Sequence, residues 1–235
     1  MQGLVPTIEH PNDGIVIIRG ALTLDEQLRV IDVSERNCRF KDAEGNWNFF
    51  GKRGREFMHL DKYTDKDGDS VFLKTCFERF KHIAVEADRS LDWASATHLL
   101  TFWYPSKQGI KWHIDSDKGG NDGDPGAPVY SLTVGNTCVF EYYLVGGAEE
   151  AKEGEKPKKC SVELASGDLI VFGGPQRLMM HQVKKIVRGS FIHKSDFDAR
   201  LNLTYRTLSS FTEDDEEKYN TANYVSRLLQ TDSTY

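Results

Sequence analysis

Arg200-Leu201-Asn202-Leu203-Thr204-Tyr205-Arg206, in the last part of this 235-residue chain, alternates strictly between polar and apolar side chains. Residues i and i+2 of an extended strand point to the same face, so both arginines share one face with the asparagine and the threonine. On an exposed edge strand, such a polar face would simply meet water. If it points into the fold instead, the two guanidinium groups require an anionic ligand, such as a small dicarboxylate held by a bidentate clamp.

The segments that precede this stretch indicate the kind of sheet to which it belongs. Short apolar or alternating segments separated by turns predict strands at residues 99–104, 110–115, 129–134, 138–144 and 169–172. Gly135-Asn136 is a candidate hairpin turn between two of these strands. Evenly spaced antiparallel strands of this kind predict a jelly-roll core, that is, a double-stranded β-helix.

The N-terminal part of the chain has a different pattern. A short buried strand is expected at residues 14–19. Thr23 and Glu26 form a capping box that predicts a helix to about Asn37, and apolar residues at helical spacing predict a second helix over residues 70–88. We expect both helices to pack outside the sheet, which makes the fold class α+β.

We predict one domain with three parts. Residues 1–98 hold the helices and a flap, residues 99–210 form the jelly-roll core, and residues 211–235 form an acidic tail. Aromatic and basic side chains suggest that the flap grips a ligand, because aromatic rings stack on bases and cations meet phosphates; the candidates are Trp47, Phe49 and Arg53. A polar surface loop with a few anchoring aromatics is the alternative. The charged stretch 146–159 is interpreted as a solvated excursion.

Composition restricts the class of protein and its partners. A hydrophobic content of 39% with 28% charged residues is ordinary for a soluble globular protein, and the apolar runs are too short to span a membrane. The N-terminus lacks the pattern of a signal peptide, and the four cysteines are scattered, so we expect an intracellular protein, cytoplasmic or nuclear, with reduced thiols. We also expect a monomer. Because the net charge is −6, a nucleic-acid partner would have to meet a local basic patch.

A second motif suggests a metal site. His113-Ile114-Asp115 would direct an imidazole and a carboxylate to one point in an extended strand, with Ile114 turned back into hydrophobic packing. His181 is the natural second histidine, and His193 is the competing candidate. Two histidines and one carboxylate are the facial arrangement that holds non-haem Fe(II) and leaves open coordination positions.

Residues 99–206 resemble the AlkB family of Fe(II)- and 2-oxoglutarate-dependent nucleic-acid dealkylases. The matching pieces are His113-Ile114-Asp115 followed by Asp117, Ser166-Gly167-Asp168, Gly173-Gly174 with Arg177-Leu178 before His181, and the Arg200–Arg206 stretch, which is similar to the family signature R-x-N-x-T-x-R.

The resemblance implies a role for each matching residue. Iron would be held by His113, Asp115 and His181. The co-substrate 2-oxoglutarate would be bound by Tyr104, Arg200, Asn202 and Arg206, and Asp117 would face a flipped base. Phe102 departs from the family pattern, which has an asparagine two residues before the tyrosine. The flap does not align with the family, so Trp47, Phe49 and Arg53 are chosen as substrate contacts by residue type alone.

The function implied by the resemblance is oxidative demethylation of N-alkylated bases in DNA or RNA, with release of formaldehyde, succinate and CO2. The enzyme would use Fe(II), 2-oxoglutarate and O2, and its methylated nucleic-acid substrate would be single-stranded or present a flipped base. Two alternatives stay open. One is a 2-oxoglutarate oxygenase that acts on a protein or lipid, which the acidic net charge favours, and the other is a non-catalytic jelly-roll binding module.

Overall fold

The computed structural model describes residues 5–37, 39–41, 47–49, 55–63, 68–104, 109–115, 126–145, 159–209 and 212–215. The predicted excursion at 146–159 and the acidic tail at 211–235 therefore lie almost wholly outside the described residues. No helix in the described ranges is long and apolar enough to cross a membrane.

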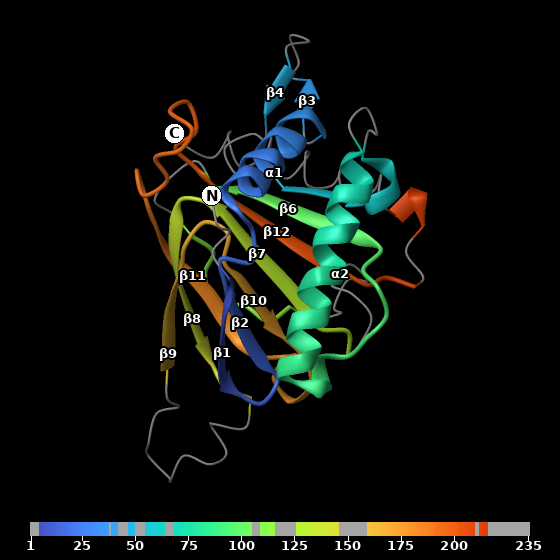
Figure 1. Ribbon diagram of the computed structural model, residues 1–235, viewed down its shortest axis with the longest axis vertical. Helices are drawn as coiled ribbons and strands as arrows, with labels where there is room; N and C mark the ends of the chain where they lie inside the picture. Colours follow the sequence, from blue (N-terminus) through green and yellow to red (C-terminus); the bar gives the residue numbers. More distant parts are fainter. Residues whose placement is uncertain are drawn as a thin grey trace, which may run out of the picture.

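The centre of the fold consists of two antiparallel sheets (Figure 1). The large sheet has seven strands in the order β1-β2-β10-β7-β12-β6-β5, and the small sheet has three in the order β11-β8-β9. The strands of the large sheet are β1 (Thr7–Asn12), β2 (Ile15–Arg19), β5 (Arg55–His59), β6 (His98–Tyr104), β7 (Val129–Gly135), β10 (Leu169–Phe172) and β12 (Arg200–Arg206). Those of the small sheet are β8 (Thr137–Tyr143), β9 (Lys159–Leu164) and β11 (Met180–Val187). A separate short hairpin is formed by β3 (Arg39–Lys41) and β4 (Trp47–Phe49).

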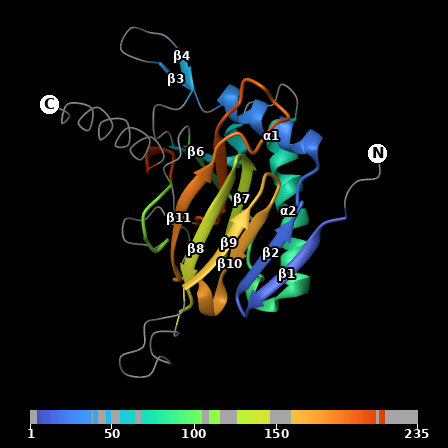
Figure 2. The same ribbon diagram turned by 90° about the vertical axis from the view of Figure 1, so that its left-hand side faces the viewer.

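Two helices cover the outer face of the large sheet, as expected for the predicted α+β class (Figures 1 and 2). They are α1 (Leu24–Asn37) and α2 (Asp69–Ala87). The capping box at the start of α1 is confirmed, because Glu26 N donates to Thr23 Oγ1 at 3.3 Å and Thr23 N donates to Glu26 Oε2 at 2.9 Å.

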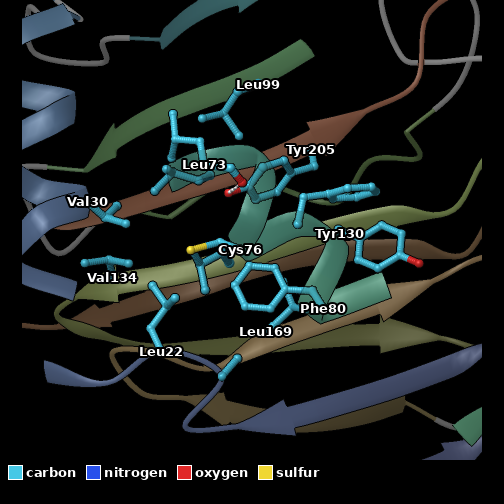
Figure 3. Packing of buried hydrophobic residues seen from close by; sticks show 14 of the residues in the cluster. Leu22, Val30, Leu73, Cys76, Phe80, Leu99, Tyr130, Val134, Leu169 and Tyr205 are labelled. Atoms are coloured by element: carbon cyan, nitrogen blue, oxygen red, sulfur yellow. Dashed lines mark hydrogen bonds between the residues drawn. The ribbon is translucent and has the colours of Figure 1, made fainter. Parts of the chain in front are cut away.

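The cluster between the helices and the large sheet is the main hydrophobic core. Figure 3 shows Leu73, Cys76 and Phe80 of α2 beside Tyr130 and Tyr205 of the sheet. Each fully buried apolar side chain of this size stabilises the fold by roughly 1.5–3 kcal/mol relative to an exposed one. This core joins the helices to the sheet and leaves the opposite face of the sheet free for a second layer.

The second layer is the small sheet, which packs against the inner face of the large sheet. Apolar residues of both sheets form this second cluster, among them Ile17 and Phe172 of the large sheet and Phe140, Tyr142 and Ile186 of the small one. Alternation along each strand therefore assigns odd and even residues to different cores, which is the arrangement of a double-stranded β-helix. The predicted jelly-roll core is confirmed.

The predicted hairpin turn at Gly135-Asn136 is wrong. β7 and β8 flank this turn, but they belong to different sheets and do not pair. Gly135 has a φ of +89° and lies so close to the backbone of Ala199 that a Cβ would clash. The buried Asn136 side chain accepts hydrogen bonds from Ser190 N at 3.1 Å and Phe191 N at 3.2 Å, which directs the chain across to the other sheet.

Candidate metal centre

Three side chains with metal-binding atoms converge at one end of the space between the sheets. They are His113, Asp115 and His181, and their ligand atoms all lie within 4.8 Å of one another. Asp115 Oδ1 is 3.6 Å from His113 Nε2 and 3.9 Å from His181 Nε2. The structure thus brings together the three residues that the sequence singled out, and it does not place His193 in this group. His193 is exposed and packs edge-on against Phe191.

Both histidines are oriented by hydrogen bonds from the ring nitrogen that faces away from the cluster. His113 Nδ1 lies 2.8 Å from Lys111 O, and His181 Nδ1 lies 3.1 Å from Met179 O. A carbonyl oxygen can only accept, so each Nδ1 carries a proton, and in the neutral ring Nε2 is then the nitrogen with a lone pair for a metal. A hydrogen bond from the second ring nitrogen to a backbone carbonyl commonly fixes the tautomer of metal-binding histidines in this way.

The segment that carries His113 and Asp115 is not the predicted strand. Only an isolated antiparallel bridge joins His113 to His181, through His113 N to His181 O and His181 N to His113 O, each at 2.9 Å. The backbone of Asp115 is held by a further contact. The buried Arg177 donates to Asp115 O at 2.6 Å and to Ala127 O at 2.7 Å. In the sequence Arg177 belongs to one of the matching motifs, but its role in holding the Asp115 backbone depends on tertiary contacts that the sequence does not show.

The electrostatics of the cluster favour metal-binding protonation states. Burial alone would raise the pKa of Asp115, but the charges of Arg206 and of both histidines outweigh burial and hold this pKa well below its usual range. Burial lowers the pKa of His181 to about 4, although the charge of Asp115 opposes that shift. At neutral pH the cluster therefore offers a carboxylate and a neutral imidazole, which are the forms that coordinate metals.

The polar face of β12 lines the same cavity, which has a volume of about 200 Å³. β12 lies between β6 and β7, and all seven of its residues are buried, so the alternative of an exposed edge strand is wrong. Four inward residues of the strand, Arg200, Asn202, Thr204 and Arg206, line the cavity beside the His-Asp-His cluster.

The guanidinium groups of the two arginines on this face make only some of the hydrogen bonds that they can donate. Arg206 Nη2 donates to Asp115 Oδ2 at 2.7 Å, and Arg200 Nη2 donates to Thr133 Oγ1 at 3.0 Å. The Nε and Nη1 atoms of both arginines are buried without a hydrogen-bond partner among the described residues, as is the Tyr104 hydroxyl. Buried guanidinium groups in this state are costly unless an anion completes their hydrogen bonds. The cavity is therefore suited to a small carboxylate-bearing molecule.

The remaining sequence predictions for this site have mixed outcomes. Ile114 does not turn back into packing. Its side chain lines the cavity and Ile114 is 39% exposed, so that prediction is wrong. Phe102 also lines the cavity, at the position where an amide side chain was expected from the family pattern. Trp47 and Phe49 lie on β4, where only the backbone is described, and Arg53 and Asp117 lie outside the described residues.

Comparison with known proteins identifies this constellation. Residues 33–206 match the family model described as the 2OG-Fe(II) oxygenase superfamily. The chain belongs to this superfamily. Its members use Fe(II), 2-oxoglutarate and O2, and the residues present fit that requirement. The His-Asp-His cluster supplies the donor set for Fe(II), and the unsatisfied guanidinium atoms beside it suit a dicarboxylate.

Individual relatives confirm the resemblance to the AlkB family. The chain is 32% identical to the alpha-ketoglutarate-dependent dioxygenase AlkB of Escherichia coli over 155 residues, which cover 66% of this chain and 64% of that protein. It is 30% identical over 126 residues to the DNA N(6)-methyladenine demethylase ALKBH1D of Arabidopsis thaliana, covering 52% of this chain and 27% of the relative. The chain thus spans only about a quarter of that relative's length.

The solved structure of OsALKBH1 has the same fold. It superposes with a TM-score of 0.60 and covers 86% of this chain and all of that one, with 21% sequence identity. At this identity, the likeness bears on the fold alone, and it agrees with the jelly-roll architecture described above.

Proposed function

We propose that this protein is an Fe(II)- and 2-oxoglutarate-dependent oxygenase that removes N-linked methyl groups from nucleic-acid bases. In this proposal His113, Asp115 and His181 bind the iron. The observation that carries it is the shared cavity, in which a His-Asp-His cluster lies beside two buried and incompletely hydrogen-bonded arginines.

The inward residues of β12 bind 2-oxoglutarate in this proposal. Arg200 lies opposite Tyr104 in the β6–β12 register, with its guanidinium 5.0 Å from the tyrosine ring, so both can approach one carboxylate. Asn202 uses its amide nitrogen to donate to Ser131 Oγ at 2.8 Å and to Leu132 O at 3.0 Å, which directs its carbonyl oxygen away from those partners. Arg206 has two further nitrogens available beyond its contact with Asp115, so it can neutralise both the iron ligand and the co-substrate.

The chemistry supplied by the bound iron, 2-oxoglutarate and O2 is hydroxylation of the N-methyl carbon, after which the hydroxymethyl group leaves as formaldehyde. The chain's own residues orient these groups and exclude water. Apolar side chains, among them Leu100, Val129, Phe140 and Phe172, line the cavity around the polar cluster. No general base among them is required, because the cleaved C–H bond is not acidic.

A nucleic-acid substrate is supported by the relatives. ALKBH1D is named as a DNA N(6)-methyladenine demethylase, and a further relative, abh1 of Schizosaccharomyces pombe, is named as a tRNA demethylase and is 26% identical over 129 residues. The metal cluster lies within the fold, so a base inside a duplex would have to flip out, or be single-stranded, to reach it. We further propose that the protein acts as an intracellular monomer, in the cytoplasm or nucleus.

A substrate panel tests the proposal. Single- and double-stranded DNA and RNA oligonucleotides carrying N-methylated adenine, cytosine or guanine are incubated with Fe(II), 2-oxoglutarate and the protein, and mass spectrometry measures loss of the methyl group. We expect methyl loss coupled to succinate formation with at least one oligonucleotide. Succinate formation stimulated by methylated or prolyl peptides, with no methyl loss from any oligonucleotide, would replace this proposal with a protein oxygenase.

A further inference from the structure

Besides the metal-binding cavity, the molecule has a second candidate binding surface on the outer face of the small sheet. In Figure 2 this face, with β8 and β9, is directed toward the viewer, and none of the described elements lies in front of it. The register places Gln182 of β11, Glu141 of β8 and Ser161 of β9 side by side, on the face opposite to His181 and Tyr142. Gln182 on this outer face directly follows the metal-binding residue His181 in the sequence, so the face starts next to the metal centre.

Aromatic side chains gather at the end of this face nearest the metal cluster. Trp112, which precedes His113, packs on Tyr143 with their ring centroids 4.7 Å apart and an interplanar angle of 31°. Both residues are half-buried rather than part of a core. Met180 precedes His181, lies opposite Tyr143 in the register, and is 44% exposed. An accessible aromatic pair of this kind is a platform on which an unpaired base can stack.

Two lysines beside the platform are held in place by one buried carboxylate. Glu141 accepts hydrogen bonds from Lys159 Nζ at 3.1 Å, Lys184 Nζ at 3.0 Å and Gln182 Nε2 at 2.6 Å. The Glu141 side chain is 3% exposed, whereas those of Lys159 and Lys184 are 44% and 54% exposed. Each ammonium group has three donors, so both lysines keep donors for a second acceptor. Because Glu141 already orders them, binding that acceptor costs less side-chain entropy.

The Glu141 cluster has one more positive than negative charge, whereas two other lysines are balanced by nearby carboxylates. Lys194 on the opposite side of the molecule lies near two carboxylates, Asp32 and Glu35, and Lys81 lies near Asp92. At Glu141 two lysines share a single carboxylate, which leaves a net positive charge at an accessible place in a protein whose overall charge is −6.

We propose that Trp112, Tyr143, Lys159 and Lys184 form a strand-binding surface for the nucleic acid that flanks the base in the cavity. The two lysines contact successive backbone phosphates, and the aromatic pair stacks a neighbouring unpaired base. The charge favours a polyanion, and the aromatic pair favours one with exposed bases. This inference rests on the proposed function, because it extends the substrate outward from the same cavity.

Binding of an unmodified, fluorescently labelled single-stranded oligonucleotide to the full chain loaded with Mn(II) and 2-oxoglutarate tests the surface. The variant pair Lys159→Gln/Lys184→Gln is compared with the matched pair Lys81→Gln/Lys194→Gln on the opposite side. We expect the first pair to weaken binding about tenfold and to reduce the slope of log Kd against log salt by about 1.4, since each phosphate contact on a single strand contributes about 0.7. The matched pair should change neither value.

A second variant keeps the test informative if the lysine pair is unstable. Trp112→Leu should weaken binding about 5- to 100-fold through lost stacking while leaving the salt slope unchanged. Thermal unfolding, with and without Mn(II) and 2-oxoglutarate, checks that each variant is folded. Equal affinities and slopes for the two lysine pairs, or no binding by the unmodified protein, would overturn the surface. Oligonucleotide binding that depends on these residues, without methyl loss from any oligonucleotide, would support the proposed strand-binding surface and contradict the proposed demethylase activity.

Discussion

The two faces of β12 are built from alternate residues of one strand, yet they serve opposite purposes. Leu201, Leu203 and Tyr205 are buried against the helices, where the Tyr205 hydroxyl donates to Leu73 O at 3.2 Å and completes its hydrogen bonds. The other face is equally buried but carries Arg200 and Arg206, whose nitrogens are incompletely satisfied by the described residues. Burial alone does not distinguish the faces, whereas hydrogen-bond satisfaction does.

This difference indicates where stability and function reside in the sheet. A face whose polar atoms are all paired contributes to folding by excluding water. A face with unpaired buried donors opposes folding until a ligand pairs with them. Its presence therefore indicates a binding site. Mutations on the two faces should therefore separate into those that change the unfolding free energy and those that change co-substrate binding.

The largest expected effect is at the metal cluster beside the polar face. His181→Ala should reduce iron-dependent succinate formation by more than about 100-fold, since losing a ligand costs more than the roughly 10- to 100-fold loss when a residue that only hydrogen-bonds to a ligand is removed. His193→Ala is the matched control, because His193 is exposed and outside the cluster. Wild-type succinate formation by His181→Ala, measured chromatographically, would remove this residue from the site.

Arg200→Met should affect binding and leave folding almost unchanged. Losing this guanidinium should raise the KM for 2-oxoglutarate by at least about 30-fold, which corresponds to about 2 kcal/mol, the low end for truncating one partner of a buried charge pair. The unfolding free energy without ligand should stay within about 1 kcal/mol of the parent or rise, because an incompletely paired buried charge has been removed.

Urea unfolding and 2-oxoglutarate titration of Arg200→Met, with Arg200→Lys as the variant that retains the charge but loses the planar fork, distinguish the two contributions. A loss of several kcal/mol in stability without any change in the KM would show that Arg200 is a structural residue.

Leu203→Ala, on the opposite face, should give the reverse result. The leucine is 1% exposed within the helix-facing core, so its truncation should lower the unfolding free energy by about 2–5 kcal/mol. The KM for 2-oxoglutarate of the folded variant should be unchanged. A raised KM together with unchanged stability would mean that the two faces are not separable.

The smallest expected effect is at Thr133, which orients Arg200 from β7. Thr133→Val preserves the shape of the side chain but removes the oxygen that accepts from Arg200 Nη2 at 3.0 Å. One such hydrogen bond contributes about 1 kcal/mol to folding, so the unfolding free energy should fall by about that amount, and the KM for 2-oxoglutarate should rise by up to about fivefold as Arg200 loses its orientation. An unchanged KM would mean that the arginine is oriented by its packing on Tyr104 instead.

The sequence was sufficient to predict which residues of β12 share a face, because strict alternation determines both faces of any strand. The open question was whether the strand lies at the edge or in the interior of the sheet. The sequence was insufficient around His113, where the predicted strand is an irregular segment held by one isolated bridge, by a hydrogen bond from Val183 N to Ile110 O and by Arg177. Such contacts depend on where distant segments meet, and local pattern does not encode them. The same reason explains Gly135-Asn136, whose sequence suits a hairpin although its tertiary partners direct it to the other sheet.

The position of β12 in the sheet has a consequence for the synthesis of the protein. β12 is the last strand of the described chain, yet it lies between β6 and β7, with which it pairs on both sides. A growing chain that has emerged from the ribosome only to residue 199 holds both neighbouring strands with unpaired edges, which are prone to intermolecular association. The large sheet can close only after residue 206 has emerged, so both edges stay open to association with other chains until then.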